Sequence, residues 1–199
     1  MSNGYFITLE GIDGAGKTTV AESIASEYKK TVLTQEPCDL WTGKQVRRAI
    51  SNETDCHPLT TFYLFMADRI EHIENIVKPA LDDGMIVVSD RYADSTLAYQ
   101  SIALRDHVRY PDTYIRQTMQ PWHFYPDLTI LLDISADTAI ERTVGDEEYE
   151  NREFLEQARQ NYQTLARQYK SRYAVIDGEQ EIEAVQQDAL KAVKEYYEH

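Results

Sequence analysis

The chain has 199 residues, 42% of them hydrophobic, which is typical of a globular protein with a full hydrophobic core. Its 34 acidic and 20 basic residues give a formal net charge of −14, which repels nucleic acid and argues against a polymer binder. We find no signal peptide and no apolar run of about 20 residues that could span a membrane, and 2 cysteines cannot form a disulfide framework, so we expect a cytoplasmic protein.

Five short apolar runs alternate with segments of helical length. The runs cover residues 5–9, 31–34, 85–89, 128–133 and 173–177. Four of them are nearly continuous in apolar or β-branched residues, as is typical of strands buried on both faces of a sheet. Helical segments are expected over residues 18–28, 58–81, 150–170 and 182–196. This alternation predicts an α/β fold with a doubly wound, five-stranded parallel sheet, in one domain over residues 1–199.

The first strand leads directly into a phosphate-binding motif. Residues 11–18 read Gly-Ile-Asp-Gly-Ala-Gly-Lys-Thr, which satisfies G-x-x-x-x-G-K-[ST]. In this motif the glycines let backbone N–H groups surround a phosphate, and the following helix adds its positive end. We expect Lys17 to contact the β- and γ-phosphates, and Thr18 to offer its hydroxyl to Mg²⁺. The residues predicted to contact ATP are Gly11, Ile12, Asp13, Gly14, Ala15, Gly16, Lys17, Thr18 and Thr19.

The helical segment 58–81 carries two sets of residues. Its apolar residues recur at helical spacing, at Leu64, Ala67, Ile70, Ile73 and Val77. Phe65 and Arg69 are one helical turn apart, so they share a face. A flat ring at the first position can stack on a pyrimidine, and a guanidinium at the second can donate to a base carbonyl. Taken alone, the pair fits a core aromatic and a surface ion-pair residue better than a base-binding pair.

The third strand is followed by Asp90-Arg91-Tyr92. In α/β folds this carboxyl end of the sheet is where ligands bind. The chain is short and has no Asn-Lys-x-Asp motif for reading guanine, which argues against a GTPase. These features favour a small kinase over a motor, a GTPase or a transporter ATPase.

Several segments resemble the thymidylate kinase family, in the family's order. They are Glu-Gly-Ile-Asp-Gly-Ala-Gly-Lys-Thr-Thr at 10–19, Glu-Pro at 36–37, Val-Arg at 46–47, Phe-Met-Ala-Asp-Arg at 65–69, Asp-Arg-Tyr at 90–92 with Ser-Thr and Ala-Tyr-Gln at 95–96 and 98–100, and Pro-Asp-Leu-Thr-Ile-Leu-Leu-Asp at 126–133. The resemblance implies a P-loop nucleoside-monophosphate kinase with a small lid, which transfers the γ-phosphate of ATP to dTMP for dTTP synthesis. It also implies Mg²⁺ and a homodimer, to which the apolar face of 58–81 contributes.

The resemblance assigns roles to individual residues. Phe65 and Arg69 would hold thymine, Arg47 and Arg91 the monophosphate, and Asp90 would help Thr18 to hold Mg²⁺. Asp13 would face the 3′-hydroxyl of the acceptor sugar, and the ring of Tyr99 would disfavour a ribose. The full set of residues expected to bind dTMP is Asp13, Glu36, Arg47, Phe65, Arg69, Arg91, Thr96, Tyr99 and Gln100.

Catalysis in this family adds an arginine to the transferring phosphoryl group, from the P-loop or from a lid. Residues 12–15 contain no arginine, so the lid, at about 142–153, must supply it. We expect Arg142 to act with Lys17 and Arg91, and Arg152 is the second candidate. The lid is unusually acidic at 146–148, and Gln35 stands where the family usually has arginine.

Two other functions remain open at this stage. One is a kinase for another pyrimidine deoxynucleotide or a deoxynucleoside, and the other is a P-loop ATP-binding protein with little turnover. The 5 histidines show no metal-binding spacing, so we expect them to be structural or exposed. The acidic composition fits an ordinary acidic protein and equally a protein of a high-salt cytosol.

Overall fold

The sheet of this protein is parallel and five-stranded. The computed structural model describes the chain except residues 1–3, 52–53, 144–151 and 198–199. Within the described part, the strands pair in the order β2-β3-β1-β4-β5. Their bounds are β1 (Tyr5–Glu10), β2 (Thr31–Gln35), β3 (Ile86–Asp90), β4 (Leu128–Asp133) and β5 (Tyr173–Asp177). The α/β fold expected from the sequence is therefore confirmed.

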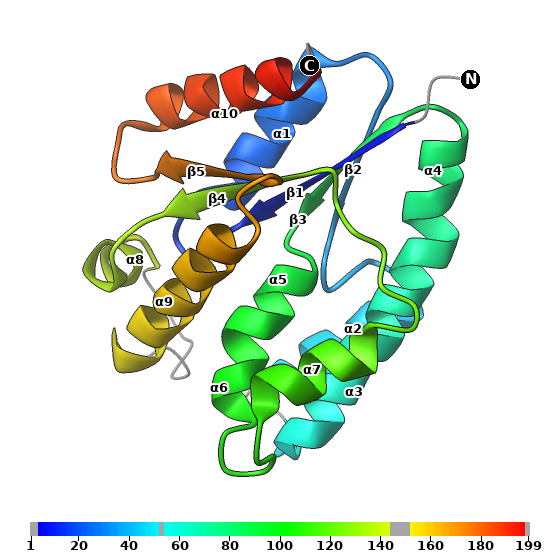
Figure 1. Ribbon diagram of the computed structural model, residues 1–199, viewed down its shortest axis with the longest axis vertical. Helices are drawn as coiled ribbons and strands as arrows, with labels where there is room; N and C mark the ends of the chain where they lie inside the picture. Colours follow the sequence, from blue (N-terminus) through cyan, green and yellow to red (C-terminus); the bar gives the residue numbers. More distant parts are fainter. Residues whose placement is uncertain (1–3, 52–53, 144–151, 198–199) are drawn as a thin grey trace.

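Helices cover both faces of the sheet (Figure 1). Their bounds are α1 (Lys17–Glu27), α2 (Trp41–Ile50), α3 (Pro58–His72), η1 (Ile73–Val77), α4 (Lys78–Asp82), α5 (Ala93–Ser95), η2 (Thr96–Gln100), α6 (Ser101–Ala103), α7 (Pro111–Met119), α8 (Ala136–Arg142), α9 (Arg152–Gln168) and α10 (Ile182–Tyr197). On one face α1 packs beside α10, and the other face carries α4, α5 and α9. The strand order reverses beside β1, so a crevice is expected where β1 and β3 end.

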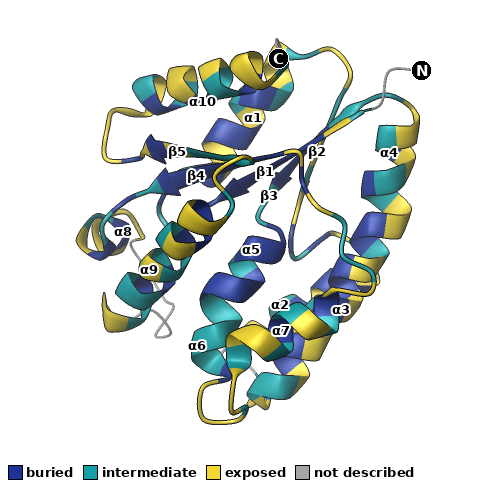
Figure 2. Cartoon of the chain, in the orientation of Figure 1, coloured by how far each residue is buried: buried dark blue, intermediate teal, exposed yellow. Residues whose placement is uncertain are grey.

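Burial separates the central strands from the edges of the sheet (Figure 2). In β1, β3 and β4 most side chains are buried, as continuous apolar runs predict. The edge strands differ, because Leu33 of β2 is 45% exposed and Val175 of β5 is 56% exposed. The expectation of strands buried on both faces therefore holds only for the centre of the sheet.

The predicted helix 58–81 is a continuous helical path through α3, η1 and α4, but its core face differs from the expected one. Ala67 is exposed and Ile70 is 41% exposed. The residues of this path that face the core include Phe62, Met66, Arg69, Ile73 and Val77. The expected residues 64, 67, 70 and 73 repeat every three residues, a spacing that drifts around a helix of 3.6 residues per turn, whereas the buried residues keep helical spacing through η1. The expected stripe is therefore wrong in its first half.

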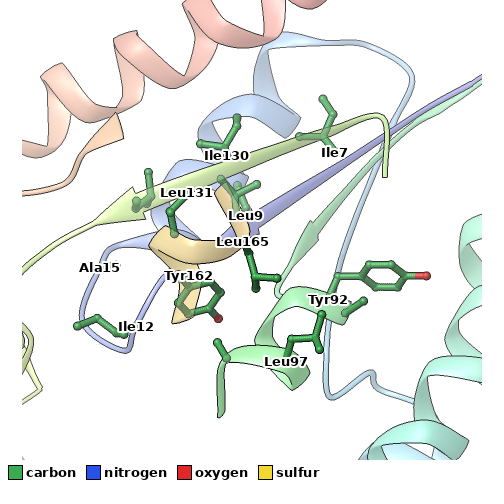
Figure 3. Close-up of a cluster of buried hydrophobic side chains, with 14 of the residues drawn as sticks. Ile7, Leu9, Ile12, Ala15, Tyr92, Leu97, Ile130, Leu131, Tyr162 and Leu165 are labelled. Carbon is green, nitrogen blue, oxygen red and sulfur yellow. The ribbon is translucent and has the colours of Figure 1, made fainter. Parts of the chain in front are cut away.

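The phosphate-binding loop rests directly on the hydrophobic core (Figure 3). Ile12 and Ala15 of the loop are almost fully buried, as are Leu131 of β4 and Tyr162 of α9, which belong to the same cluster. Because interiors pack densely, the loop has little freedom to move independently of the sheet. Among the described residues, no helix combines the length and apolarity needed to cross a membrane.

Candidate active site

The phosphate-binding segment 11–18 consists of the loop 11–16 between β1 and α1 and the first two residues of α1, and the shape of the loop requires its glycines. Gly11 has φ 142° and Gly14 has φ 78°, conformations that L side chains rarely adopt. A Cβ on Gly11 would lie 2.5 Å from the carbonyl oxygen of Leu132, and one on Gly14 would lie 2.9 Å from that of Ala139. Both backbone conformation and available space therefore demand glycine.

Lys17, the first residue of α1, is buried inside this loop. Its Nζ donates to the carbonyl oxygen of Ile12 at 2.8 Å and lies 3.9 Å from the carboxylate of Asp13. Burial, followed by the charge of Arg91, lowers the pKa of Lys17 to about 8. Because burial and a neighbouring positive charge both disfavour the charged form of Lys17, an anionic ligand beside it would stabilise the ammonium.

Thr18 and Asp90 meet at the carboxyl end of β3. The Thr18 hydroxyl donates to Oδ2 of Asp90 at 2.5 Å, and Oδ1 of Asp90 is buried without a hydrogen-bond partner in the described structure. A hydroxyl and a carboxylate are the oxygen ligands that Mg²⁺ prefers, usually together with phosphate oxygens and water. The pair fits such an ion, although no group of three or more acidic, histidine or cysteine side chains forms a metal site among the described residues.

Arg91 and Asp13 join the phosphate loop to the Asp-Arg-Tyr turn. The Arg91 guanidinium forms an ion pair with Asp13, donates to the Gly11 carbonyl at 3.3 Å and lies 5.3 Å over the ring of Tyr99. The Tyr99 hydroxyl donates to the other oxygen of Asp13 at 3.2 Å. Two of the groups that hold the Asp13 carboxylate therefore belong to elements beyond the phosphate loop.

Arg91 is also strained, and Glu10 stabilises the turn that holds it. The backbone of Arg91 has φ 67°, a conformation that costs a non-glycine residue of order 1 kcal/mol or more. The buried carboxylate of Glu10 accepts from the backbone N–H of Tyr92 at 2.9 Å and from the hydroxyls of Ser95 and Tyr162 at 2.6 and 3.0 Å. Burial, and after it the charge of Asp94, raises the pKa of Glu10 to about 7. Glu10 thus connects β1 to the turn after β3 and to α9.

A cavity of about 380 Å³ opens beside this turn. Every residue predicted to bind the acceptor except Arg47 lines it, namely Asp13, Glu36, Phe65, Arg69, Arg91, Thr96, Tyr99 and Gln100. These residues come from the phosphate loop, the segment after β2, α3, the turn after β3, and η2. The cavity therefore brings together residues that lie far apart in the sequence.

Arg69 and Glu36 form a buried ion pair in the cavity wall. The Nη2 atom of Arg69 lies 2.6 Å from Oε2 of Glu36, and the two side chains are 1% and 3% exposed. Burial raises the pKa of Glu36, but the charge of Arg69 and the contact with His72, together with their hydrogen bonds, outweigh it and hold that pKa below its ordinary value. Arg69 also donates to the Thr96 hydroxyl at 2.8 Å, which links α3 to η2.

Arg47 lies behind the cavity wall. Its Nη1 donates to the carbonyl oxygen of Pro37 at 2.8 Å, and its Nη2 lies 3.5 Å from the carboxylate of Asp39. Pro37 itself lines the cavity, so Arg47 contacts a residue of the cavity wall but not the cavity. Its predicted contact with the acceptor phosphate would require the side chain to leave these partners.

The two lid arginines have different surroundings. Arg142 ends α8, its Nη1 donates to the carbonyl oxygen of Gly178 at 3.0 Å, and its Cβ would lie 3.4 Å from a Cβ placed on Gly14. Arg152 forms an exposed, two-pronged ion pair with Asp137. Residues 146–148, the acidic part of the expected lid, lie outside the described residues. Of the two arginines, Arg142 is the one packed against the phosphate loop.

Sequence reasoning missed several residues of this site. Phe154 of α9 lines the cavity with its ring 5.8 Å from that of Tyr99, and Tyr162 of the same helix reaches Glu10. Neither residue belongs to a local sequence motif. Each reaches the site only through contacts in the folded chain. Glu10 did carry a signal, since it is an acidic residue directly before the phosphate loop at the end of a buried strand.

A phosphate loop after β1, a carboxylate and an arginine at the carboxyl end of β3, and an adjoining cavity define a P-loop kinase of small nucleotides. The model of the thymidylate kinase family matches residues 9–189. The chain therefore belongs to the thymidylate kinase family, and the resemblance seen in the sequence is confirmed.

Individual relatives agree with this assignment. A probable thymidylate kinase from Halobacterium salinarum is 42% identical over 188 residues, covering 94% of each chain. One from Methanococcoides burtonii is 37% identical over 195 residues, covering 96% of each. The crystal structure of thymidylate kinase from Ehrlichia chaffeensis matches with a TM-score of 0.75 and 29% identity, covering 96% of this chain and 99% of that one. The sheet order and the helices therefore have a counterpart of known structure.

Proposed function

We propose that this chain transfers the γ-phosphoryl group of ATP to dTMP, with Mg²⁺, at the site formed by the phosphate loop and the adjoining cavity. The observation that carries the proposal is that one cavity is lined both by Asp13 of the phosphate loop and by Phe65 and Arg69 of α3. An acceptor nucleotide in that cavity would place its phosphate towards the loop and its base towards α3. Such positioning provides most of the catalysis in phosphoryl transfer.

On the donor side, the backbone of residues 11–18 would surround the phosphates of ATP. The negative charge of the triphosphate would restore the basicity that burial takes from Lys17. Thr18 and Asp90 would hold Mg²⁺, which when bound neutralises phosphate charge. Arg142 would add its charge on the side of the loop covered by α8.

On the acceptor side, Arg91 would hold the phosphate of dTMP, because a guanidinium matches a phosphate dianion with two parallel hydrogen bonds. Tyr99 and Asp13 would lie beside the sugar, and Phe65 would stack on the base. Arg69 would donate to a base carbonyl, since among the described residues its Nη1 atom has only the weakly accepting sulfur of Met119, at 3.3 Å, as a hydrogen-bond partner. Arg47 would join the phosphate contacts only after leaving Pro37.

The alternatives weighed from the sequence are less well supported. The family match and the names of the relatives favour dTMP over another pyrimidine deoxynucleotide or a deoxynucleoside as the acceptor. A P-loop protein with little turnover is disfavoured by the same comparisons. A coupled ADP-release assay over a panel of nucleosides and monophosphates tests the proposal, and selective turnover of dTMP is the expected result. The cytoplasmic location remains a prediction.

Replacing Phe65 with alanine should raise KM for dTMP by about 10-fold or more, because stacking of a base on an aromatic ring contributes ~1–3 kcal/mol. KM for ATP should change little, since Phe65 lines only the acceptor side of the site. Steady-state kinetics with each substrate varied in turn provides the measurement. Phe65→Leu, which keeps apolar bulk but loses the ring, is the matched variant and should show the same selective effect. An equal rise in both KM values would identify Phe65 as a packing residue.

We further propose a homodimer that uses the outer face of α3. Tyr63 is 50% exposed and Ile70 is 41% exposed on this helix, seven residues apart and therefore on one side of it. Light scattering at low and high salt should give twice the mass of the 23.0 kDa chain. Ile70→Glu should shift the mass towards the monomer, because it places a charge in an apolar contact. A monomeric wild-type protein in every condition would contradict the proposal.

A further inference from the structure

His72, which no motif singled out, lies next to the wall of the acceptor cavity. It is the last residue of α3, it is fully buried, and both of its ring nitrogens have polar partners. Nδ1 lies 3.0 Å from Oε1 of Glu36, and Nε2 lies 2.9 Å from the hydroxyl of Thr34. The imidazole therefore bridges β2 and the segment that follows it.

Glu36 is held from two positions on the same helix. Arg69 and His72 are three residues apart on α3, so their side chains lie on one face. Arg69 donates through Nε and Nη2 to Oε2 of Glu36, at 2.9 and 2.6 Å, and its Nε also reaches Oε1 at the longer distance of 3.2 Å, while His72 lies 3.0 Å from Oε1. Because Glu36 is buried and ionised, its oxygens need such donors, and loss of the His72 contact leaves Oε1 with only the longer bond from Arg69 Nε.

The same contacts determine where Arg69 lies. Its Nε and Nη2 atoms are occupied by Glu36, the Thr96 hydroxyl and the Tyr92 carbonyl, whereas Nη1 has the sulfur of Met119. Nη1 is thus the nitrogen best able to donate to a ligand. Arg69 lines the cavity, and the position of its guanidinium there depends on how Glu36 holds it.

We infer that His72 is a positioning residue for base recognition, which fixes Glu36 and, through Glu36, holds Arg69 in place to read the acceptor base. The inference rests on the proposed function. A guanidinium donates to the 4-carbonyl of thymine, but it meets a second donor in the 4-amino group of cytosine. Correct placement of Arg69 therefore favours dTMP over dCMP, and its misplacement should reduce that preference.

Two substitutions of His72 separate its two contacts. Asparagine places an amide N–H near the position of Nδ1 and can still donate to Glu36, whereas glutamine reaches towards Thr34 and cannot replace the Nδ1 contact. We expect H72Q to raise KM for dTMP and to lower the ratio of kcat/KM for dTMP over dCMP, each by about 10-fold, with KM for ATP nearly unchanged. H72N should retain most of the wild-type ratio. An unchanged ratio in folded H72Q, or equal losses for dTMP and ATP in both variants, would overturn the inference.

A double variant tests whether His72 acts through Arg69. Arg69→Lys keeps the charge beside Glu36 but loses the planar donor, so it should itself lower the ratio of dTMP to dCMP. Adding H72Q to this variant should lower the ratio no further, because residues acting in one chain of contacts are not additive. Additive losses would count against the inference. An unchanged ratio in Arg69→Lys would overturn the inference at its premise, that Arg69 reads the base. If wild type does not phosphorylate dTMP, the proposed function fails instead.

A measurement on the wild-type protein avoids the question of folding. In a long-range ¹H–¹⁵N spectrum of the imidazoles, dTMP should shift the Nδ1 signal of His72, and a non-hydrolysable ATP analogue should leave it in place. The H72N variant assigns the signal. If dTMP leaves the Nδ1 chemical shift unchanged, His72 is not coupled to base binding and the inference is overturned.

Discussion

Lys17→Ala should lower kcat by about 10³-fold or more, because it removes the loop's own cation from the transferring phosphoryl group. The variant should fold at least as well as wild type. Burial lowers the pKa of Lys17, which means that its charge is held in the empty loop at a cost in folding free energy that alanine does not carry. Turnover is measured by coupled ADP release, and folding by circular dichroism and thermal unfolding.

Lys29→Ala is the matched control for this prediction. Lys29 is exposed and lies after the end of α1, outside the phosphate loop. Its replacement should leave kcat and the unfolding temperature close to those of wild type. A folded Lys17→Ala protein that keeps most of its kcat would refute the assignment of the phosphate loop.

Arg142→Ala should lower kcat by about 10²-fold or more with a small change in ATP affinity, because an arginine that meets the transferring phosphoryl group acts mainly in the transition state. In the structure the side chain is held by the Gly178 carbonyl and leaves α8 beside Gly14. It therefore needs only a local movement to reach the phosphates. Single-turnover and steady-state kinetics, with ATP binding measured separately, distinguish the two effects.

Arg152→Ala is the comparison for Arg142. Arg152 pairs with Asp137 on the surface, and an exposed ion pair of this kind contributes little. Its loss should reduce kcat much less than the loss of Arg142. Near-normal kcat in both single variants and in the double variant would show that this protein works without a lid arginine.

The phosphate loop could be predicted from the sequence because its residues are consecutive. Its backbone provides the ligands, and glycine positions encode that backbone directly. The acceptor cavity is different, since it takes residues from several elements that meet only in the folded chain. Phe65, Arg69 and Arg91 were found through the family resemblance. Phe154 and His72 were not, because neither belongs to a sequence motif and each reaches the site only through contacts in the folded chain.

The errors have physical causes of the same kind. The helix at 58–81 was expected to keep one apolar stripe, but the strict three-residue spacing of its first residues drifts around a helix, and the buried Arg69 takes a core position. Leu33 and Val175 read as interior residues, yet they lie on edge strands where burial depends on neighbours. Local patterns predicted which elements form, and packing decided which of their faces became buried.

Asp13 is a residue of the donor loop, yet its carboxylate is held by Arg91 and Tyr99 in the wall of the acceptor cavity. If this ion pair rearranges when a nucleotide binds at the donor loop, the surroundings of the acceptor cavity change as well, and the reverse also holds. Thermodynamic linkage requires the effect to be reciprocal, so ATP must alter the affinity for dTMP by the same factor by which dTMP alters the affinity for ATP. The affinity for either nucleotide is then a property of the pair of ligands, and it has a single value only when the concentration of the other is stated.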